Sequence, residues 1–117
     1  MVRTQRILEF DVQKQRLRKH PGCDFTGIVA GSVGYLRAKF HLSPEEWQDC
    51  AVKVARFWLG DKESSAKLDE NNSCDIPPDV LTGEKFAASV LGVSPGYQIE
   101  TNEVKVKQEV RRNGNGC

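Results

Sequence analysis

The residues of this sequence with the clearest chemical potential are two histidines and two of its four cysteines. His20 and Cys23 lie close together in the chain, and His41 and Cys50 follow later. Imidazole and thiolate groups are the usual ligands of tetrahedral zinc, so these four residues are the candidate metal ligands. Zinc sites usually contain two close pairs of ligands, and only one close pair is present here. We therefore expect ordinary loop and core residues, with no metal and no other cofactor.

Catalysis requires a nucleophile or an acid that is held next to a base, and the sequence does not place such partners together. One candidate arrangement is Cys23 or Cys50 as nucleophile with either histidine as base. The other candidates are two pairs of acids, Glu45-Glu46 and Asp61 with Glu63. Acid pairs in turns are usually just solvated. We expect a protein that is not an enzyme.

The charge balance gives little attraction for polyanions. Seventeen Lys and Arg residues against 16 Asp and Glu residues leave a formal charge of +1, so no long-range field favours nucleic acid or anionic lipid. One basic run stands out, and a solvated strand edge is its commoner explanation: Lys14, Arg16, Arg18 and Lys19. No apolar run approaches the roughly 20 residues that cross a bilayer. We expect a soluble protein with free thiols, made in a reducing cytosol, without nucleic-acid or membrane partners.

A chain of 117 residues suits one domain, and we assign it to 1–110, with a flexible tail at 111–117 that exposes Cys117. Alternation of apolar and polar residues predicts strands, and Pro, Gly and Asn mark the turns between them. Glu9 and Asp11 occupy the wet side of the first strand, and His41 points outward from the second. The segment 13–20 is an edge strand or a loop. The expected strands are 7–12, 35–42, 64–68, 86–92 and 97–110, with turns at 60–61 and 70–73.

The segment 43–59 supports two interpretations. Ser43, Pro44 and Glu46 form a capping box with proline at the first helical position, and apolar residues recur at helical spacing as far as Gly60. The alternative is a short helical turn at 44–48 followed by a strand at 51–59, with Ala55 and Phe57 facing the core. The local signals are nearly even.

A family resemblance extends over roughly residues 6 to 110. The sequence resembles the amino-terminal β-sandwich modules of phage tail and baseplate proteins, notably the baseplate upper protein family. The residues that carry the resemblance, in chain order, are Gly34-Tyr35-Leu36-Arg37-Ala38-Lys39-Phe40, Trp47, Ala55-Arg56-Phe57, Cys74-Asp75-Ile76-Pro77, Phe86 with Ser89-Val90, and Thr101-Asn102-Glu103-Val104. Members of this family normally continue into a long carboxy-terminal region, whereas this chain stops at Cys117, which fits an accessory or an excised module.

The resemblance implies an all-β fold, an immunoglobulin-like antiparallel sandwich of about seven strands. It favours the strand at 51–59. It also implies a non-enzymatic structural module of the virion or prophage that is made in the host bacterial cytoplasm. Its partners would be other phage structural proteins, copies of itself and, in a supporting role, a host surface glycan. The alternative function is a carbohydrate-binding sandwich, and for both functions the candidate contact residues are Tyr35, Trp47, Trp58 and Tyr97.

Overall fold

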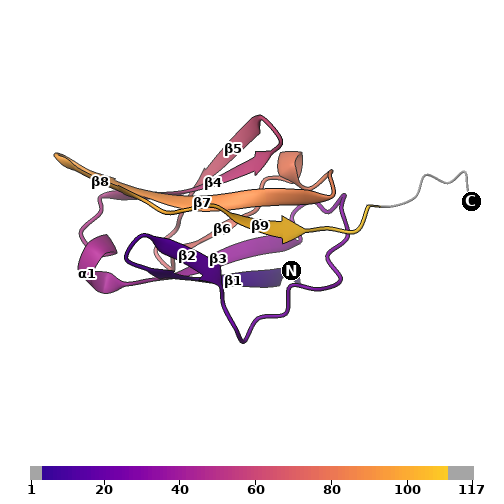
Figure 1. Cartoon of the computed structure of the whole chain (residues 1–117), viewed down its shortest axis with the longest axis horizontal. Helices are drawn as coiled ribbons and strands as arrows, with labels where there is room; N and C mark the ends of the chain where they lie inside the picture. The colour runs from indigo at the N-terminus through magenta and orange to yellow at the C-terminus, as the bar shows by residue number, and fades with distance from the viewer. Residues whose placement is uncertain (1–3, 111–117) are drawn as a thin grey trace, which may run out of the picture.

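The computed structural model describes residues 4–110, which fold into two β-sheets that face each other across a shared core (Figure 1). The first sheet has the order β2-β1-β3-β6, and the second has the order β5-β4-β7-β8, with β9 also paired to β7. The all-β sandwich predicted from the sequence is confirmed. The strands are β1 (Arg6–Gln13), β2 (Arg16–Lys19), β3 (Leu36–Leu42), β4 (Val52–Leu59), β5 (Lys62–Lys67), β6 (Ser73–Asp75), β7 (Lys85–Ser94), β8 (Tyr97–Glu100) and β9 (Val104–Lys107).

Two details of the sandwich differ from the expectation. The described range contains nine strands rather than about seven, and β1 pairs with β3 in parallel rather than antiparallel. The parallel pair arises because the loop after β2 returns the chain to the start of β1, where Arg6 N donates to Tyr35 O at 2.8 Å. Two parallel strands require such a crossover, whereas a tight hairpin always reverses direction. The remaining strand pairs are antiparallel.

The predicted strand 97–110 is wrong as a single element, because it is divided between β8 and β9. At the break, Thr101 Oγ1 accepts a hydrogen bond from Val90 N at 3.0 Å, so a side chain replaces part of the ladder. The next residue turns to the other sheet. Asn102 Oδ1 accepts from Leu17 N at 2.7 Å, and Asn102 Nδ2 donates to Leu17 O at 3.1 Å. Asn102 therefore ties the edge strand β2 to the second sheet.

The contested segment contains both a helix and a strand. The short helix α1 (Pro44–Trp47) precedes β4, in which Ala55 and Phe57 are fully buried, as predicted. The helix does not continue, because β4 forms backbone ladders with β5 on one side and β7 on the other. Those ladders satisfy the backbone N–H and C=O groups of this segment, which a continued helix would otherwise have paired internally, and its β-branched and aromatic residues suit a strand. The hairpin expected at Gly60 is confirmed, with φ of 60° at that residue.

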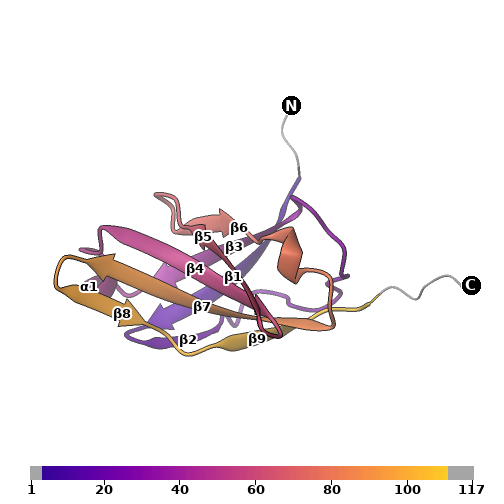
Figure 2. The same ribbon diagram turned by 90° about the horizontal axis from the view of Figure 1, so that it is seen from above.

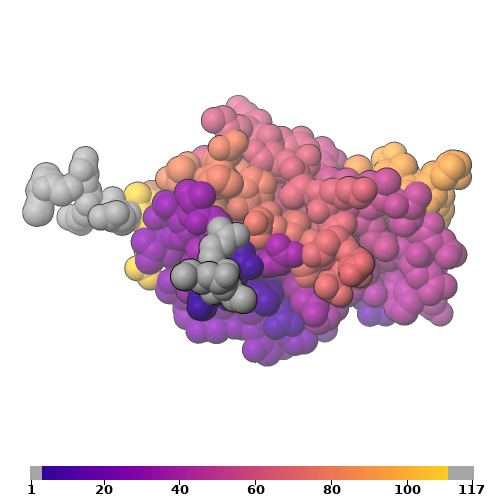
Figure 3. Space-filling model, turned by 180° about the vertical axis from the view of Figure 1, so that it is seen from behind, coloured from indigo at the N-terminus to yellow at the C-terminus, as the bar shows by residue number. Residues whose placement is uncertain are grey.

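The core lies between the sheets, and aromatic rings fill it from both sides. Phe10 and Phe40 stack at 5.2 Å between centroids, and Phe57 meets Phe86 at 6.1 Å. Seen from above, the strands of the two sheets form two crossed layers (Figure 2). The hairpin between β7 and β8 projects at one end of the molecule, which is also visible in orange from behind (Figure 3). These layers leave two outward faces for function.

The remaining expectations are resolved within the same range. The segment 13–20 contains the edge strand β2, and the turn at 70–73 contains Asn72 with φ of 58°. A 3-10 turn, η1 (Pro78–Val80), follows the short strand β6. No helix in residues 4–110 has the length and hydropathy of a membrane span. The expected tail at 111–117, with Cys117, lies outside the described residues.

Candidate binding faces

The outward surface of the first sheet carries charged side chains from neighbouring strands. We call this surface the charged face, and its members are Glu9, Asp11, Arg18, His20, Arg37, Lys39, His41 and Asp75. Strand alternation places them outward, opposite the buried Leu8, Phe10 and Phe40. The strand order then determines the neighbours, since Asp11 is paired with Arg18 of β2 and with His41 of β3.

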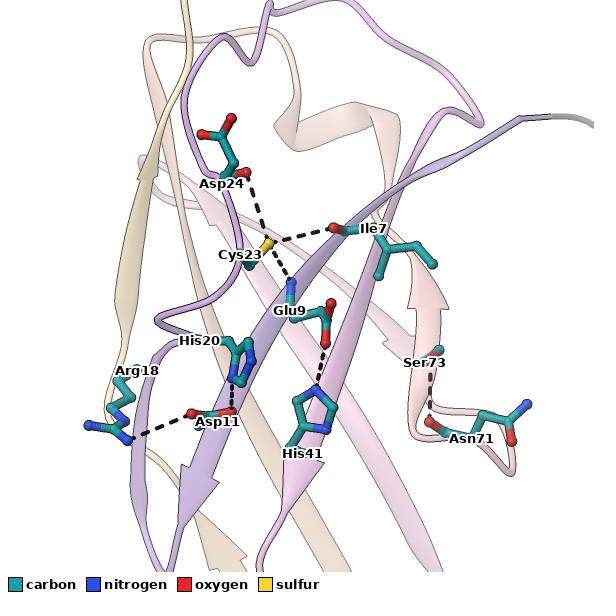
Figure 4. A network of polar contacts seen from close by, with 10 residues as sticks. All are labelled: Ile7, Glu9, Asp11, Arg18, His20, Cys23, Asp24, His41, Asn71 and Ser73. Carbon is teal, nitrogen blue, oxygen red and sulfur yellow. Dashed lines mark hydrogen bonds and ion pairs between the residues drawn. The ribbon is translucent and has the colours of Figure 1, made fainter.

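A cluster of histidines and carboxylates lies at the centre of the charged face (Figure 4). His20 Nδ1 is 2.8 Å from Asp11 Oδ1, and His41 Nε2 is 2.7 Å from Glu9 Oε1. The two imidazole rings lie 5.2 Å apart between centroids. The bond from His41 holds the pKa of the Glu9 carboxyl below its ordinary value of 4.5, and His20 and Lys39 act in the same direction. The cluster therefore gathers two imidazoles and two carboxylates, which are groups that can bind a metal cation.

The structure brings together part of the set of metal ligands proposed from the sequence. His20 and His41 meet on the charged face, and Cys23 lies beside β1, where its sulfur accepts a hydrogen bond from Glu9 N at 3.3 Å. Cys50 lies elsewhere, buried against Trp47 beneath β7, and an added Cβ at Gly92 would lie 2.6 Å from its sulfur. The four residues therefore do not form one site, because Cys50 faces the core.

The residues considered for catalysis have mainly structural contacts. Cys50 Sγ lies 3.9 Å from Glu46 O, and burial raises the pKa of its thiol. Burial also raises the pKa of the Cys74 thiol, to about 12. One member of each acid pair is held by a neighbouring side chain: Glu46 Oε1 accepts from Ser43 Oγ at 2.7 Å, and Glu63 binds Arg56. Cys23, Cys50 and Cys74 are free thiols, as expected.

The basic run Lys14 to Lys19 is distributed around the edge of the first sheet rather than gathered on one surface. Arg18 Nη2 lies 3.7 Å from Asp11 Oδ2, and the Lys19 ammonium lies 5.4 Å from the centre of the Phe25 ring. Lys14 occupies the turn between β1 and β2, where its carbonyl accepts from Trp47 Nε1 at 2.8 Å. Arg18 therefore contributes its charge to the charged face, whereas Lys19 contacts an aromatic ring outside that face.

The outward surface of the second sheet has a different composition. We call it the tryptophan face, and its members are Val52, Val54, Arg56 and Trp58 from β4 with Leu91 and Val93 from β7. Val52 is paired directly with Val93, and Val54 with Leu91. Val52 is 38% exposed and Val93 is 36% exposed, so the end of this face presents aliphatic surface to solvent.

A single ionic cluster interrupts the tryptophan face. Arg56 Nε donates to Glu63 Oε2 at 2.8 Å, and Arg56 Nη1 also binds Glu100. The same guanidinium lies 4.9 Å from the centre of the Trp58 ring. These contacts raise the pKa of Arg56 and lower that of Glu63. Arg56 of β4 therefore links the adjacent strand β5 to β8, which lies beyond β7, and its guanidinium lies beside the Trp58 indole.

Trp58 borders a groove of about 290 Å³ at the far end of the tryptophan face. One aromatic ring next to amino and carboxylate groups is an arrangement that can stack on an apolar surface and hydrogen-bond to hydroxyl groups. The groove is lined by Trp58, Gly60, Lys85, Ala87, Glu103 and Lys105, among others.

The four aromatic residues proposed as contacts do not form one site. Trp47 is 0% exposed, so this candidate is wrong for a surface contact: its indole completes the core. Trp58 is half-buried on the tryptophan face. Tyr35 is 45% exposed beside the start of β3, and Tyr97 is 44% exposed at the β7–β8 hairpin, where its hydroxyl donates to Glu46 O at 2.9 Å. Since β3 runs from Tyr35 towards α1, these tyrosines mark opposite ends of the sandwich.

Sequence reasoning missed the cluster of histidines and carboxylates, although it had placed three of its members correctly. It assigned Glu9 and Asp11 to the wet side of their strand and His41 to an outward position, and all three lie there. Their proximity depends on the parallel pairing of β1 with β3, which no local pattern in the sequence specifies. Comparisons with protein-family models, with curated proteins and with solved structures found no match to this chain.

Proposed function

We propose that this protein is a non-enzymatic structural module of a phage tail or baseplate, located in the virion and made in the host cytoplasm. In this proposal the tryptophan face binds other structural proteins of the virion and copies of the same chain. The resemblance of residues 6 to 110 to the baseplate upper protein family supports the virion context. The main structural support is the composition of the tryptophan face.

The tryptophan face combines the residue types that dominate the energy of protein interfaces. Trp and Arg are enriched among the residues whose truncation weakens binding most, and this face carries both, Arg56 within β4 and Trp58 at the end that borders the groove. The paired valines, Val52 and Val93, add exposed apolar surface at one end. A docking surface combines anchor residues with a polar rim, and this face offers Arg56 and Trp58 as anchors, with Glu63 and Glu100 as flanking charges.

Light scattering after size exclusion tests self-association through this face. We expect the wild-type chain to associate as its concentration rises, and we expect V52E, V52E/V93E and W58A to shift towards the monomer. I7E is the matched control for V52E alone, because Ile7 is 48% exposed on the opposite sheet and each of these two variants adds one negative charge. A wild-type chain that stays monomeric, or an I7E effect equal to that of V52E, would contradict docking of copies through the tryptophan face.

The genomic position of the coding sequence tests the virion context separately. A position among tail and baseplate genes supports the proposal, because genes for one appendage are usually grouped. A position among metabolic genes contradicts it. This observation is independent of whether the chain associates with itself.

The Trp58 groove favours a second candidate function, the binding of a carbohydrate such as a host surface glycan. An indole beside Lys85, Glu103 and Lys105 can stack on a sugar ring while the charged groups bind its hydroxyls. Titration with sugars, followed by tryptophan fluorescence, tests this candidate. The chain has two tryptophans, and W58F leaves only the buried Trp47 as a reference. A saturable change in the wild type that disappears in W58F supports glycan binding, and a flat response contradicts it.

A further inference from the structure

We propose that Asp11, His20 and His41 form a binding site for a first-row divalent transition metal, with Zn²⁺ as the best-matched ion. One ligand atom from each residue lies within 4.8 Å of the other two. Two imidazoles and one carboxylate are a common set of protein ligands for zinc and related ions. The site lies on the charged face, so it is independent of the function proposed for the tryptophan face.

Three strands bring the ligands together. The register of β1 with β3 pairs Asp11 with His41, and the hairpin from β1 to β2 returns His20 to the same place, with His20 Nδ1 at 2.8 Å from Asp11 Oδ1. Ligand atoms around tetrahedral zinc lie roughly 3.3 Å apart, given metal–ligand distances near 2 Å. The side chains are 23% to 42% exposed, so small rotations about their torsions can close the remaining distance.

Glu9 supplies a fourth polar group next to the three ligands. Its Oε1 lies 2.7 Å from His41 Nε2, and a carboxylate that accepts from a metal-bound imidazole fixes the orientation and the tautomer of that ring. The open side of the site is a depression of about 490 Å³ that Asp11 and His41 line together with Arg18 and Lys39. Solvent can therefore reach the metal and complete its coordination.

The charges around the site divide into two opposing pairs. Glu9 and Asp11 attract a cation, whereas Arg18 and Lys39 repel it. Arg18 contacts Asp11 only at 3.7 Å, and its side chain is 66% exposed, so it can move away at small cost.

Calorimetric titration of the full chain with Zn²⁺ tests the site, in a C23S/C117S background that removes thiols able to bind zinc elsewhere. We expect one Zn²⁺ per chain, and a loss of binding in H20Q/H41Q and in D11N. E9Q should weaken binding about tenfold, as expected for a group that orients a ligand. D69N/D75N is the matched control, because it removes two carboxylates that contact Arg37 outside the cluster, Asp75 of β6 and Asp69 of the loop before β6, and it should bind Zn²⁺ as the parent does.

Nuclear magnetic resonance gives a second readout, since the chain has only two histidines. Both imidazole signals should shift together on addition of Zn²⁺, and Mg²⁺ should leave them unchanged because it prefers ligand sets made of oxygen. Circular dichroism of each variant confirms that the strands persist. The proposal is overturned by unchanged Zn²⁺ binding in H20Q/H41Q, by a parent chain that binds no Zn²⁺, or by an equal response to Mg²⁺.

Discussion

The two outward faces of the sandwich have the same backbone pattern and different surfaces. On the charged face most of the named side chains have a polar partner on a neighbouring element, as Arg37 does with Asp69 of the β5–β6 loop and Asp75 of β6 at 2.6 and 2.8 Å. On the tryptophan face one ionic cluster around Arg56 is surrounded by valine, leucine and tryptophan. The first face is therefore suited to ions, and the second to an apolar partner.

The difference shows that two properties of a strand residue are set separately. One is the side of the sheet on which its side chain lies, and the other is which residues of adjacent strands lie next to it. Alternation assigns His41 and Val52 to outward positions by the same rule. Strand order decides what each residue meets there, since β3 lies next to β1 and β4 lies next to β7. Four substitution experiments, described from the largest expected effect to the smallest, test this contrast.

The largest difference in the loss of stability is expected between substitutions of the two tryptophans, because one belongs to the core and the other to an outward face. W47A should lower the free energy of unfolding by about 3–5 kcal/mol, since it removes a buried indole that also donates to Lys14 O. W58A should cost less than about 1.5 kcal/mol, since the Trp58 side chain is only partly buried. Urea unfolding of both variants measures the difference. Equal losses would contradict the placement of the two indoles.

Substitution of Asn102, which links the two sheets, should give the next largest loss of stability. N102A leaves the amide and carbonyl of Leu17 without their side-chain partners, which should cost about 1–3 kcal/mol. N102D keeps the acceptor for Leu17 N and loses only the donor to Leu17 O, so it should lose less. Hydrogen exchange at the Leu17 amide reports the same contact, and protection that persists in N102A would show that β2 is held by other groups.

The two ionic clusters offer a matched comparison, because the side chains of Arg37 and Arg56 are each 27% exposed. Each arginine-to-methionine variant should lose about 1 kcal/mol, and the loss should shrink at high salt. R56M should lose more, because Arg56 also packs on Trp58 at 4.9 Å. Thermal unfolding at low and high salt measures both. A larger loss in R37M than in R56M would contradict the expectation that packing on Trp58 adds to the contribution of Arg56.

The smallest expected effect is the dependence on pH of the contribution that Glu9 makes to stability. The folded pKa of Glu9 lies below its ordinary value of 4.5, so Glu9 stabilises the fold above that pH and loses this contribution as the pH falls through the folded pKa. E9Q should therefore be less stable than the parent at neutral pH and equally stable in strong acid. Urea midpoints across the acidic range measure the gap. A gap that is constant with pH would mean that the contact with His41 contributes nothing through charge.

The helix and strand in the contested segment show how far local patterns extend. The capping box at Ser43 correctly predicts where α1 begins, although the Ser43 hydroxyl accepts from Lys14 N at 3.0 Å rather than from the helix. Where α1 ends depends on β5 and β7, which pair with β4 on both sides. Tertiary pairing therefore overrides the helical spacing of Cys50, Val54 and Trp58, because a ladder on two sides satisfies more backbone groups than one short helix.

The sequence by itself determined the class of fold and the side of each strand that faces the core. Period-two alternation in 7–12 and 35–42 places Phe10 and Phe40 inward and Asp11 and His41 outward, because successive side chains of any strand point to opposite sides. Only the tertiary structure decided that Asp11, His20 and His41 lie together. That decision depends on the crossover that sets β3 parallel to β1, and residues distant in the chain become neighbours only through such long-range pairing.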